Sequence, residues 1–337
     1  MLTRRKEQVL RAIVGEYVSM GIPVASESIA RRYELGVSPA TIRHEMVELE
    51  EGGYIRQPHT SAGRIPSDRG YRYYVEFLIE GEELPWEEQC TVRHQFHQVE
   101  RELEEWARLA AAVLSHLVRN VAVVTLPKAV ESRLRHVELI LLQEFLALMI
   151  IVFQQAKLRR QIVTLSESVS AEGLSTIARR LSEAYAGLTG RQIVAKRFSL
   201  SNLEWQIVGA MVQALEAEEE QEYDEPYVAG LHHIPVQPEF GSAEDMAQLM
   251  GLLEAGRVES ILPRRPSGGE VQVVIGGENR QQGMSNVSVV AADYGVRDQY
   301  SGVIGVVGPT RMPYPRAIGT VRFLSSVMSE LASEVYG

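Results

Sequence analysis

The side chains best suited to recognising a partner lie close together near the start of the chain. Ser38 and Thr41 carry hydroxyls that can bond a phosphate or a base edge, and Arg43 carries a planar guanidinium that can contact guanine through two parallel hydrogen bonds. His44 adds ring nitrogens at the next position. This grouping predicts contact with duplex DNA rather than a chemical reaction.

A helix opening at Ser38 must present these residues. Ser38 is a favourable N-cap, and Pro39 then occupies the first helical position, where proline is favoured. One face is predicted to be buried: Ile42, Met46 and Leu49. The opposite face carries Ala40, Arg43, His44 and Val47. Because Ala40 is small, the start of this helix could approach the floor of a groove, as a recognition helix does.

Two other helices are predicted to support it. Apolar residues at helical spacing indicate a first helix that ends near Met20 and Gly21. Ser26 is predicted to cap a second helix, and residues 35–37 turn the chain into the third. The pattern is that of a helix-turn-helix.

A hairpin follows, with predicted strands over residues 54–57 and 63–66. Its short polar tip, bracketed by two arginines, fits a wing that lies along the DNA backbone or minor groove. The predicted wing contacts are Arg56, His59, Thr60, Ser61, Gly63 and Arg64. The alternative is that the arginines only solvate a surface turn. Ser67 or Asp68 then caps a helix whose tyrosines are expected to pack rather than to stack on bases.

The charge of the chain supports DNA contact only at its amino end. The net charge is −10, but residues through Val75 hold eleven Lys or Arg against nine Asp or Glu, and the remainder holds 23 against 35. No run reaches the roughly 18 apolar residues of a membrane span, no secretory signal is visible, and Cys90 is the single cysteine. We expect a soluble cytoplasmic protein without metal or cofactor.

Catalytic motifs are missing from the sequence. It holds no Walker loop, no H-E-x-x-H, no G-x-S-x-G and no cysteine paired with a convincing base. We therefore expect that the protein is not an enzyme.

The rest of the sequence is read as a regulatory body. Apolar residues at alternating spacings of four and three over residues 87–118 predict one long connecting helix. That helix could form a dimer contact, act as a spacer, or pack on its own chain. Strands are predicted at six places: 137–142, 146–153, 161–165, 271–275, 287–292 and 302–307. Ser170 is expected to cap a helix after the third strand, and a final helix is expected from about Pro315 to Val335.

The middle of the chain has a different character. Helices are predicted over residues 203–223 and 243–255, so this part looks like an insertion between two halves of a sheet domain. The first of these helices ends in an acidic run: Glu216, Glu218, Glu219, Glu220 and Glu222. A solvated face is the favoured interpretation of that run, against a role in repelling DNA or binding a partner.

Several segments resemble the heat-inducible transcription repressor family HrcA. They are Gly36–Arg43, His59–Pro66, Asp68–Val75, Leu114–Ser115, Ala122–Pro127, Ile275–Asn279 and Gly308–Met312 with Tyr314. The resemblance implies a dimeric repressor of chaperone operons that binds an inverted-repeat operator, is released on heat stress and is modulated by the chaperonin. It also implies a GAF-like sheet domain interrupted by an inserted dimerising domain.

Together these features predict an α+β multidomain protein. Its expected parts are a winged-helix DNA-binding domain at 1–80, a connecting helix at 81–119, a GAF-like domain at 120–200 and 268–337, and an inserted dimerisation domain at 201–267. The alternative function is a winged-helix regulator that responds to a small ligand in the GAF-like domain. Heat control is expected to arise from marginal stability of the body or of its dimer contact.

Overall fold

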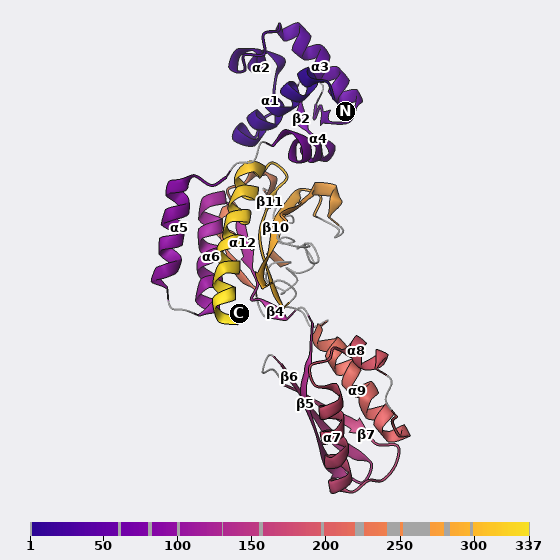
Figure 1. Cartoon of the computed structure of the whole chain (residues 1–337). Coiled ribbons are helices and arrows are strands. Elements are labelled where there is room, and N and C mark those ends of the chain that lie inside the picture. Colours follow the sequence, from indigo (N-terminus) through magenta and orange to yellow (C-terminus); the bar gives the residue numbers. More distant parts are fainter. Residues whose placement is uncertain are drawn as a thin grey trace. The chain divides into compact units, whose positions relative to one another are not determined.

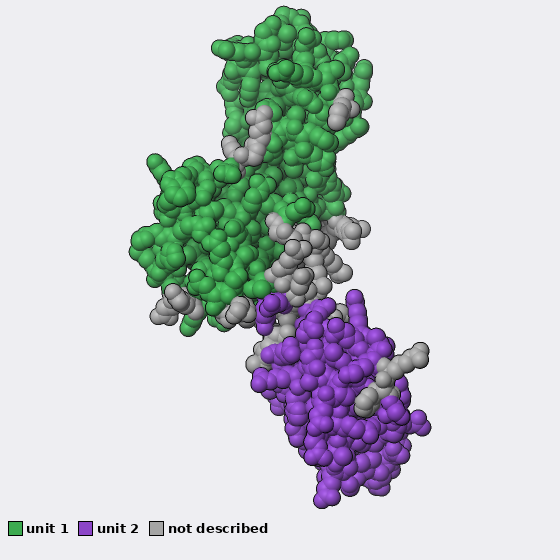
Figure 2. Space-filling view, viewed as in Figure 1, with its two compact units in different colours: residues 1–127, 223–296, 302–337 green, residues 128–222, 297–301 purple. Residues whose placement is uncertain are grey.

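The computed structural model describes residues 2–59, 62–79, 83–99, 102–129, 131–154, 158–196, 199–219, 226–240, 250–251, 270–279, 284–296 and 299–336. The chain is an α+β protein that divides into two compact units, shown in two colours in Figure 2. The first unit comprises residues 1–127, 223–296 and 302–337, and the second comprises residues 128–222 and 297–301. Within the first unit we call residues 2–79 the head and the remainder the body.

The head is a small helical domain closed by a hairpin. Its elements are α1 (Arg4–Met20), α2 (Ser26–Arg32), α3 (Pro39–Glu51), β1 (Ile55–Arg56), β2 (Ile65–Pro66), α4 (Asp68–Tyr73) and the π-helical turn η1 (Tyr74–Leu78). β1 and β2 pair antiparallel, with Ile55 opposite Pro66. The core is formed by side chains that are at most 2% exposed: Leu10, Ile13, Ile29, Ile42, Leu49, Ile55 and Tyr71.

Most predicted boundaries in the head are confirmed. α1 ends at Met20, followed by Gly21 in the left-handed conformation, and Ser67 caps α4 by accepting a hydrogen bond from the Gly70 amide. The predicted cap of α2 is wrong, because Ala25 is the N-cap and Ser26 is already helical. Val24 pairs with Arg64 in a short bridge, so the extended chain ends one residue earlier than expected.

The predicted connecting helix over residues 87–118 is also wrong. The structure has two helices, α5 (Trp86–Gln98) and α6 (Leu103–Val118), and Val99 between them is extended. Val92 and Phe96 of α5 and Trp106 of α6 are buried in the same apolar cluster. The apolar seam is therefore divided between two separate helices that contribute to one core. Of the three alternatives, packing on its own chain is the one observed.

The body is a sheet covered by helices. Five strands of its described residues follow the order β8-β3-β11-β10-β9. Their bounds are β3 (Val121–Val124), β8 (Tyr227–Ala229), β9 (Gln272–Ile275), β10 (Val287–Val296) and β11 (Tyr300–Pro309). Along β3, Ala122 and Val124 face one apolar cluster while Val121 and Val123 face another. This alternation shows that both faces of the sheet are buried.

Helices cover one face of this sheet, and short turns cover the other. α12 (Tyr314–Tyr336) lies beside α6 and α5 against the sheet in Figure 1. On the opposite face, Ile234 and Phe240 pack on the strands next to the short helices η2 (Leu231–His233) and η3 (Pro238–Phe240). A last turn, η4 (Gly276–Glu278), follows β9. The predicted late strands and the final helix are confirmed.

The second unit is a meander covered by helices. Its elements are β4 (Lys128–Ala129), β5 (Leu134–Gln143), β6 (Leu146–Phe153), β7 (Leu158–Thr164), α7 (Ala171–Tyr185), α8 (Gly190–Ala195) and α9 (Asn202–Glu219). The strands β5, β6 and β7 pair antiparallel in sequence order, as predicted. Ser170 caps α7, also as predicted, by accepting from the Gly173 amide.

The predicted division of the body differs from the observed one. Residues 120–200 and 268–337 were expected to share one sheet, but the meander belongs to the second unit and forms a sheet of its own. α9 was expected in a separate insert, yet its Ile207 and Met211 share one core with Met149 and Ile151 of β6. The meander therefore buries its inner face on helices that follow it in the sequence. The helix predicted at 243–255 lies outside the described residues, apart from residues 250 and 251.

Candidate nucleic-acid interface

α3 is fixed in the head from its first turn. Ser38 is its N-cap and accepts a hydrogen bond from the Thr41 amide at 3.2 Å, and Pro39 occupies the first turn. Ile42, Met46 and Leu49 are buried, which confirms the predicted stripe. The apolar face thus fixes the rotation of the helix and turns the opposite face outward.

The predicted contact residues lie on that outward face. Ala40, Arg43, His44 and Val47 are all exposed, and the side chains of Arg43 and His44 are 71% and 73% exposed. Thr41, at the edge of the face, is half-buried. The structure brings these residues together on one surface that no described element covers.

Polar groups on this surface are only loosely engaged. The Arg43 Nη2 atom lies 3.7 Å from Glu27 Oε1, and both side chains are exposed. The Ser38 and Thr41 hydroxyl oxygens lie 3.0 Å apart, so one of the two hydroxyl protons serves their mutual bond and the other is left to donate. Exposed ion pairs of this kind contribute little to stability. Exchanging them for contacts to a polyanion would cost the head little.

The hairpin is held by its own short hydrogen bonds. Gln57 Nε2 donates to the Ala62 carbonyl at 2.9 Å, and the Ala62 amide donates to the His59 carbonyl at 2.9 Å. Arg56 and His59 are exposed. The predicted wing contacts Thr60 and Ser61 lie outside the described residues.

Arg64 and Gly63 were predicted as wing contacts, and in the structure both residues contact other parts of the head. Arg64 Nη2 lies 2.8 Å from Glu50 Oε2, and its side chain is 18% exposed. At Gly63, an added Cβ would lie 2.5 Å from the Val24 carbonyl carbon. Both residues hold the hairpin against α3 and the chain before α2, which leaves Arg56 as the more accessible arginine of the pair.

A hollow of about 390 Å³ lies between the start of α2, the outward edge of α3 and the hairpin. Glu27, Arg43 and Met46 border it from the helical side, and Gln57 and Ala62 border it from the hairpin. The outward face of α3 and the hairpin are thus separated by a recess, and the Arg43 guanidinium lies at its rim.

Two carboxylates at this site escaped the sequence reasoning. Glu27 faces Arg43, and Glu50 pairs with Arg64. Neither carboxylate stands at a helical or strand spacing from its arginine, because each pair joins different elements. Only the folded arrangement of α2, α3 and the hairpin reveals them.

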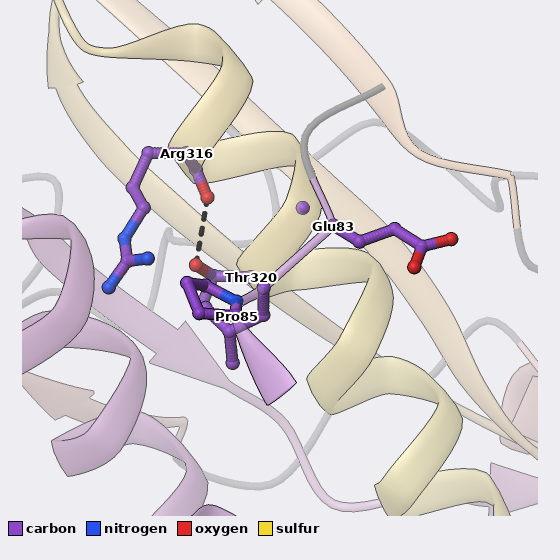
Figure 3. A pocket seen from close by; sticks show the side chains of 6 residues that line it. Glu83, Pro85, Arg316 and Thr320 are labelled. Atoms are coloured by element: carbon purple, nitrogen blue, oxygen red, sulfur yellow. Dashed lines mark hydrogen bonds between the residues drawn. The ribbon is translucent and has the colours of Figure 1, made fainter. Parts of the chain in front are cut away.

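A second hollow, of about 180 Å³, lies beside the first turns of α12 and shows no comparable chemistry. Figure 3 shows the Glu83 carboxylate and the Arg316 guanidinium pointing in opposite directions, while the Thr320 hydroxyl donates to the Arg316 carbonyl at 2.8 Å. In the ranges that the structure describes, no group of three His, Cys, Asp or Glu side chains is placed to hold a metal ion. Nor does any helix in those ranges combine the length and apolar character needed to cross a membrane.

Comparisons with known proteins extend over the whole chain. The family model described as the HrcA protein C terminal domain matches residues 104–318. A heat-inducible transcription repressor HrcA from Dehalococcoides mccartyi is 44% identical, and the match covers 100% of this chain and 98% of that protein. One from a Roseiflexus species is 41% identical, covering 100% and 96%. A crystal structure described as that of a hypothetical protein shares the fold, with 22% identity, a TM-score of 0.59 and 99% of each chain covered.

Proposed function

Because the chain belongs to the HrcA family of heat-inducible transcription repressors, we propose that it represses transcription by binding duplex DNA through its head. The protein is a transcription repressor and not an enzyme. The head acts as a winged helix, with α3 in the major groove and the hairpin along the adjacent backbone. By resemblance to the family, its targets are the operons of chaperones.

The observation that carries this proposal is the outward face of α3. Its apolar side is buried, its N-terminus is capped, and Arg43 and His44 extend into solvent beside the hairpin. Arg43, Thr41 and His44 would read base edges, because they lie at the exposed start and middle of the helix. Ser38, Arg56 and His59 would contact the backbone, which supplies affinity rather than sequence preference. Ala40 permits close approach.

We also propose a homodimer, formed through the second unit. β5, β6 and β7 have one face covered by helices, and the other face, here called the sheet face, carries exposed apolar side chains. Ile140, Leu158 and Ile162 of this face are 43%, 59% and 62% exposed. Apolar patches of this kind mark protein contacts. The dimer contact therefore lies on the meander rather than in the predicted insert at 201–267.

A second copy of the chain is the occupant that the charges of the sheet face favour. One row across the sheet runs from Glu138 on β5 through Ile150 on β6 to Arg160 on β7. A twofold axis parallel to β6 would place β5 of one copy over β7 of the other, so that each Glu138 meets the Arg160 of the partner. An axis across the strands through this row would instead oppose like charges, which is unfavourable. The first arrangement also stacks Ile140 on Ile162.

A twofold dimer sets the form of the operator. Two identical heads related by the axis read the same sequence on opposite strands, so the operator is an inverted repeat. Warming that weakens the dimer contact would release both heads together, which couples temperature to repression. By resemblance to the family, the chaperonin modulates this equilibrium. We propose that the repressor acts in the cytoplasm, where the operator lies. The small-ligand alternative stays a prediction without a supporting contact.

Footprinting of the purified full chain on promoter DNA tests the function, and Arg43→Ala tests the site. The variant should lose about 1 to 3 kcal/mol of binding free energy on the operator and much less on random duplex. The body variant Arg93→Ala removes another exposed ion pair, with Glu330, whose two side chains are 45% and 55% exposed, and it should leave binding unchanged. If Arg43→Ala weakened binding equally on the operator and on random duplex, the assignment of Arg43 would be contradicted. If the footprint showed no protected inverted repeat, the proposed function would be contradicted.

A further inference from the structure

Segments far apart in the sequence meet where the head joins the body. On the head side they are α4 and the last turn of α1, and on the body side they are the turn η4 after β9 and the start of α12 with the residues before it. We infer that this junction is a rigid clamp that fixes the orientation of the head for binding the inverted repeat, with Asp68, Arg72 and Arg311 as its positioning residues. The inference rests on the proposed function and names how that same site is aimed.

Asp68 makes the first contact. Its Oδ2 atom accepts a hydrogen bond from the Gly277 amide at 2.8 Å. The preceding Gly276 has a φ of +48°, and an added Cβ would lie 2.6 Å from Asp68 Oδ1. Only glycine leaves room for the carboxylate here, so the turn η4 is shaped to receive Asp68.

Arg72, one helical turn later, makes the second contact. Its Nε donates to Glu278 Oε1 at 2.8 Å, its Nη2 bonds the other carboxylate oxygen, and the same Nη2 donates to the Val273 carbonyl at 2.7 Å. Glu278 is itself oriented by the Ile275 amide, 2.9 Å from Oε2. The hydrogen bond with Glu278 raises the pKa of Arg72. A two-pronged pair of this kind fixes direction as well as distance.

Arg311 makes the third contact, at the end of α1. Its Nη1 donates to the Val18 carbonyl in the last turn of α1 at 3.3 Å, and its Nε bonds Glu239 of the body. Arg311 also lies against Gly21, 3.7 Å from the position of an added Cβ. The end of α1, whose carbonyls lack helical partners, is thereby tied to the body.

A buried aromatic pair lies within the same junction. The rings of Tyr71 in α4 and Tyr314 in α12 have centroids 5.6 Å apart. The Tyr314 hydroxyl donates to the Thr310 carbonyl at 2.8 Å and lies 2.8 Å from the Ser288 hydroxyl. The polar contacts therefore surround a packed apolar contact, and a head held by all of them has little freedom to rotate.

Fixed orientation matters only when both heads bind at once. Half-sites of an inverted repeat lie about one or more helical turns of DNA apart, roughly 34 to 36 Å. A head that is held in place presents α3 to the second half-site at a high effective concentration, and a head that swings does not. α4 directly follows the hairpin, so a clamp on α4 also aims the hairpin.

The test compares the full chain with Arg72→Met, which keeps the apolar stem but loses every junction hydrogen bond of Arg72. Arg93→Met is the matched control. Arg93 Nη1 donates to Glu330 Oε2 at 2.6 Å, and this pair lies in the body rather than at the junction with the head. Affinities are measured for the operator, for a single half-site, and for operators with the spacer lengthened or shortened by one to three base pairs. We expect Arg72→Met to bind the operator about tenfold more weakly, to bind the half-site as the wild type does, and to tolerate altered spacers better.

Three results would overturn the inference: equal losses on operator and half-site, tighter operator binding by Arg72→Met, or unchanged spacer dependence. If thermal unfolding shows that Arg72→Met is not folded, Glu278→Gln takes its place. This variant keeps the shape of the side chain and the Ile275 contact, so it should change the ratio of operator affinity to half-site affinity in the same direction but less. Wild-type protein that binds neither DNA would instead overturn the proposed function. Wild-type binding with unaffected ratios would overturn the clamp alone.

Discussion

The head and the second unit each present one outward face, and the most exposed side chains of the two faces differ in chemistry. On α3 they include the cationic Arg43 and the polar His44, both more than two-thirds exposed. On the sheet face they include the apolar Leu158 and Ile162, which are 59% and 62% exposed. Similar exposure therefore has a different meaning in the head and in the second unit.

The difference lies in what each face gains by being covered. Cations gain by releasing the counterions of a phosphate backbone, so their contribution falls as salt rises. Apolar side chains gain by leaving water, at about 25 cal/mol for each Å² removed, and salt changes this little. The head is thus suited to a polyanion, and the sheet face to a dry contact with another protein surface.

The comparison breaks most severely if the sheet face stays in solvent in the native protein. Ile162→Asp would place an unpaired carboxylate in the dimer contact, which should weaken dimerisation by about 100-fold or more. Sedimentation velocity should show monomers, and operator affinity should fall while half-site affinity is kept. Val194→Asp is the matched control, since Val194 is 63% exposed in the same unit but lies on α8. An Ile162→Asp protein that remains dimeric would show that the contact lies elsewhere.

A charge exchange sharpens the comparison by testing the register of the two sheets. Glu138→Arg should weaken the dimer by roughly tenfold, because it brings two cations together across the axis. The double variant Glu138→Arg with Arg160→Glu should restore most of that loss, as a double-mutant cycle of a direct pair requires. His136, whose Nε2 lies 3.2 Å from Glu138 Oε2, stays unchanged in both. Additive losses in the double variant would rule out the parallel axis.

Local signals in the sequence were enough to place many elements of the fold. Ser38 and Ser170 each cap a helix as predicted, Ser67 is the one of two predicted residues that caps α4, and Gly21 ends a helix. Each of these signals acts within a turn of the chain, through a side chain that accepts a nearby backbone amide or a residue that tolerates a positive φ. The outward face of α3 followed from the same kind of reasoning.

Features that depend on distant partners were not predictable in this way. The helical spacing of apolar residues continues through Val99. No local signal therefore predicted that the helix is interrupted there and that α5 and α6 share one core. The strands of the meander resemble those of the body in sequence, and only their packing on α7 and α9 distinguishes them. The contact between Asp68 and Gly277 joins residues 209 positions apart. Sequence periodicity carries no information about such pairs.

The two arginines of the hairpin provide the finest test of the comparison, because one is exposed and the other is paired. Arg56→Ala should weaken operator binding a few-fold and lower the slope of log affinity against log salt by about 1, the value for one lost phosphate contact. Arg64→Ala should leave that slope unchanged and lower the melting temperature instead, since it deprives Glu50 of its partner at 2.8 Å. Titrations of both variants at several salt concentrations, with thermal unfolding, separate the two effects. If Arg64→Ala lowers the slope as much as Arg56→Ala does, the ion pair between Arg64 and Glu50 breaks when DNA binds. Burial in the free protein would then not distinguish residues that contact DNA from residues that only support the hairpin.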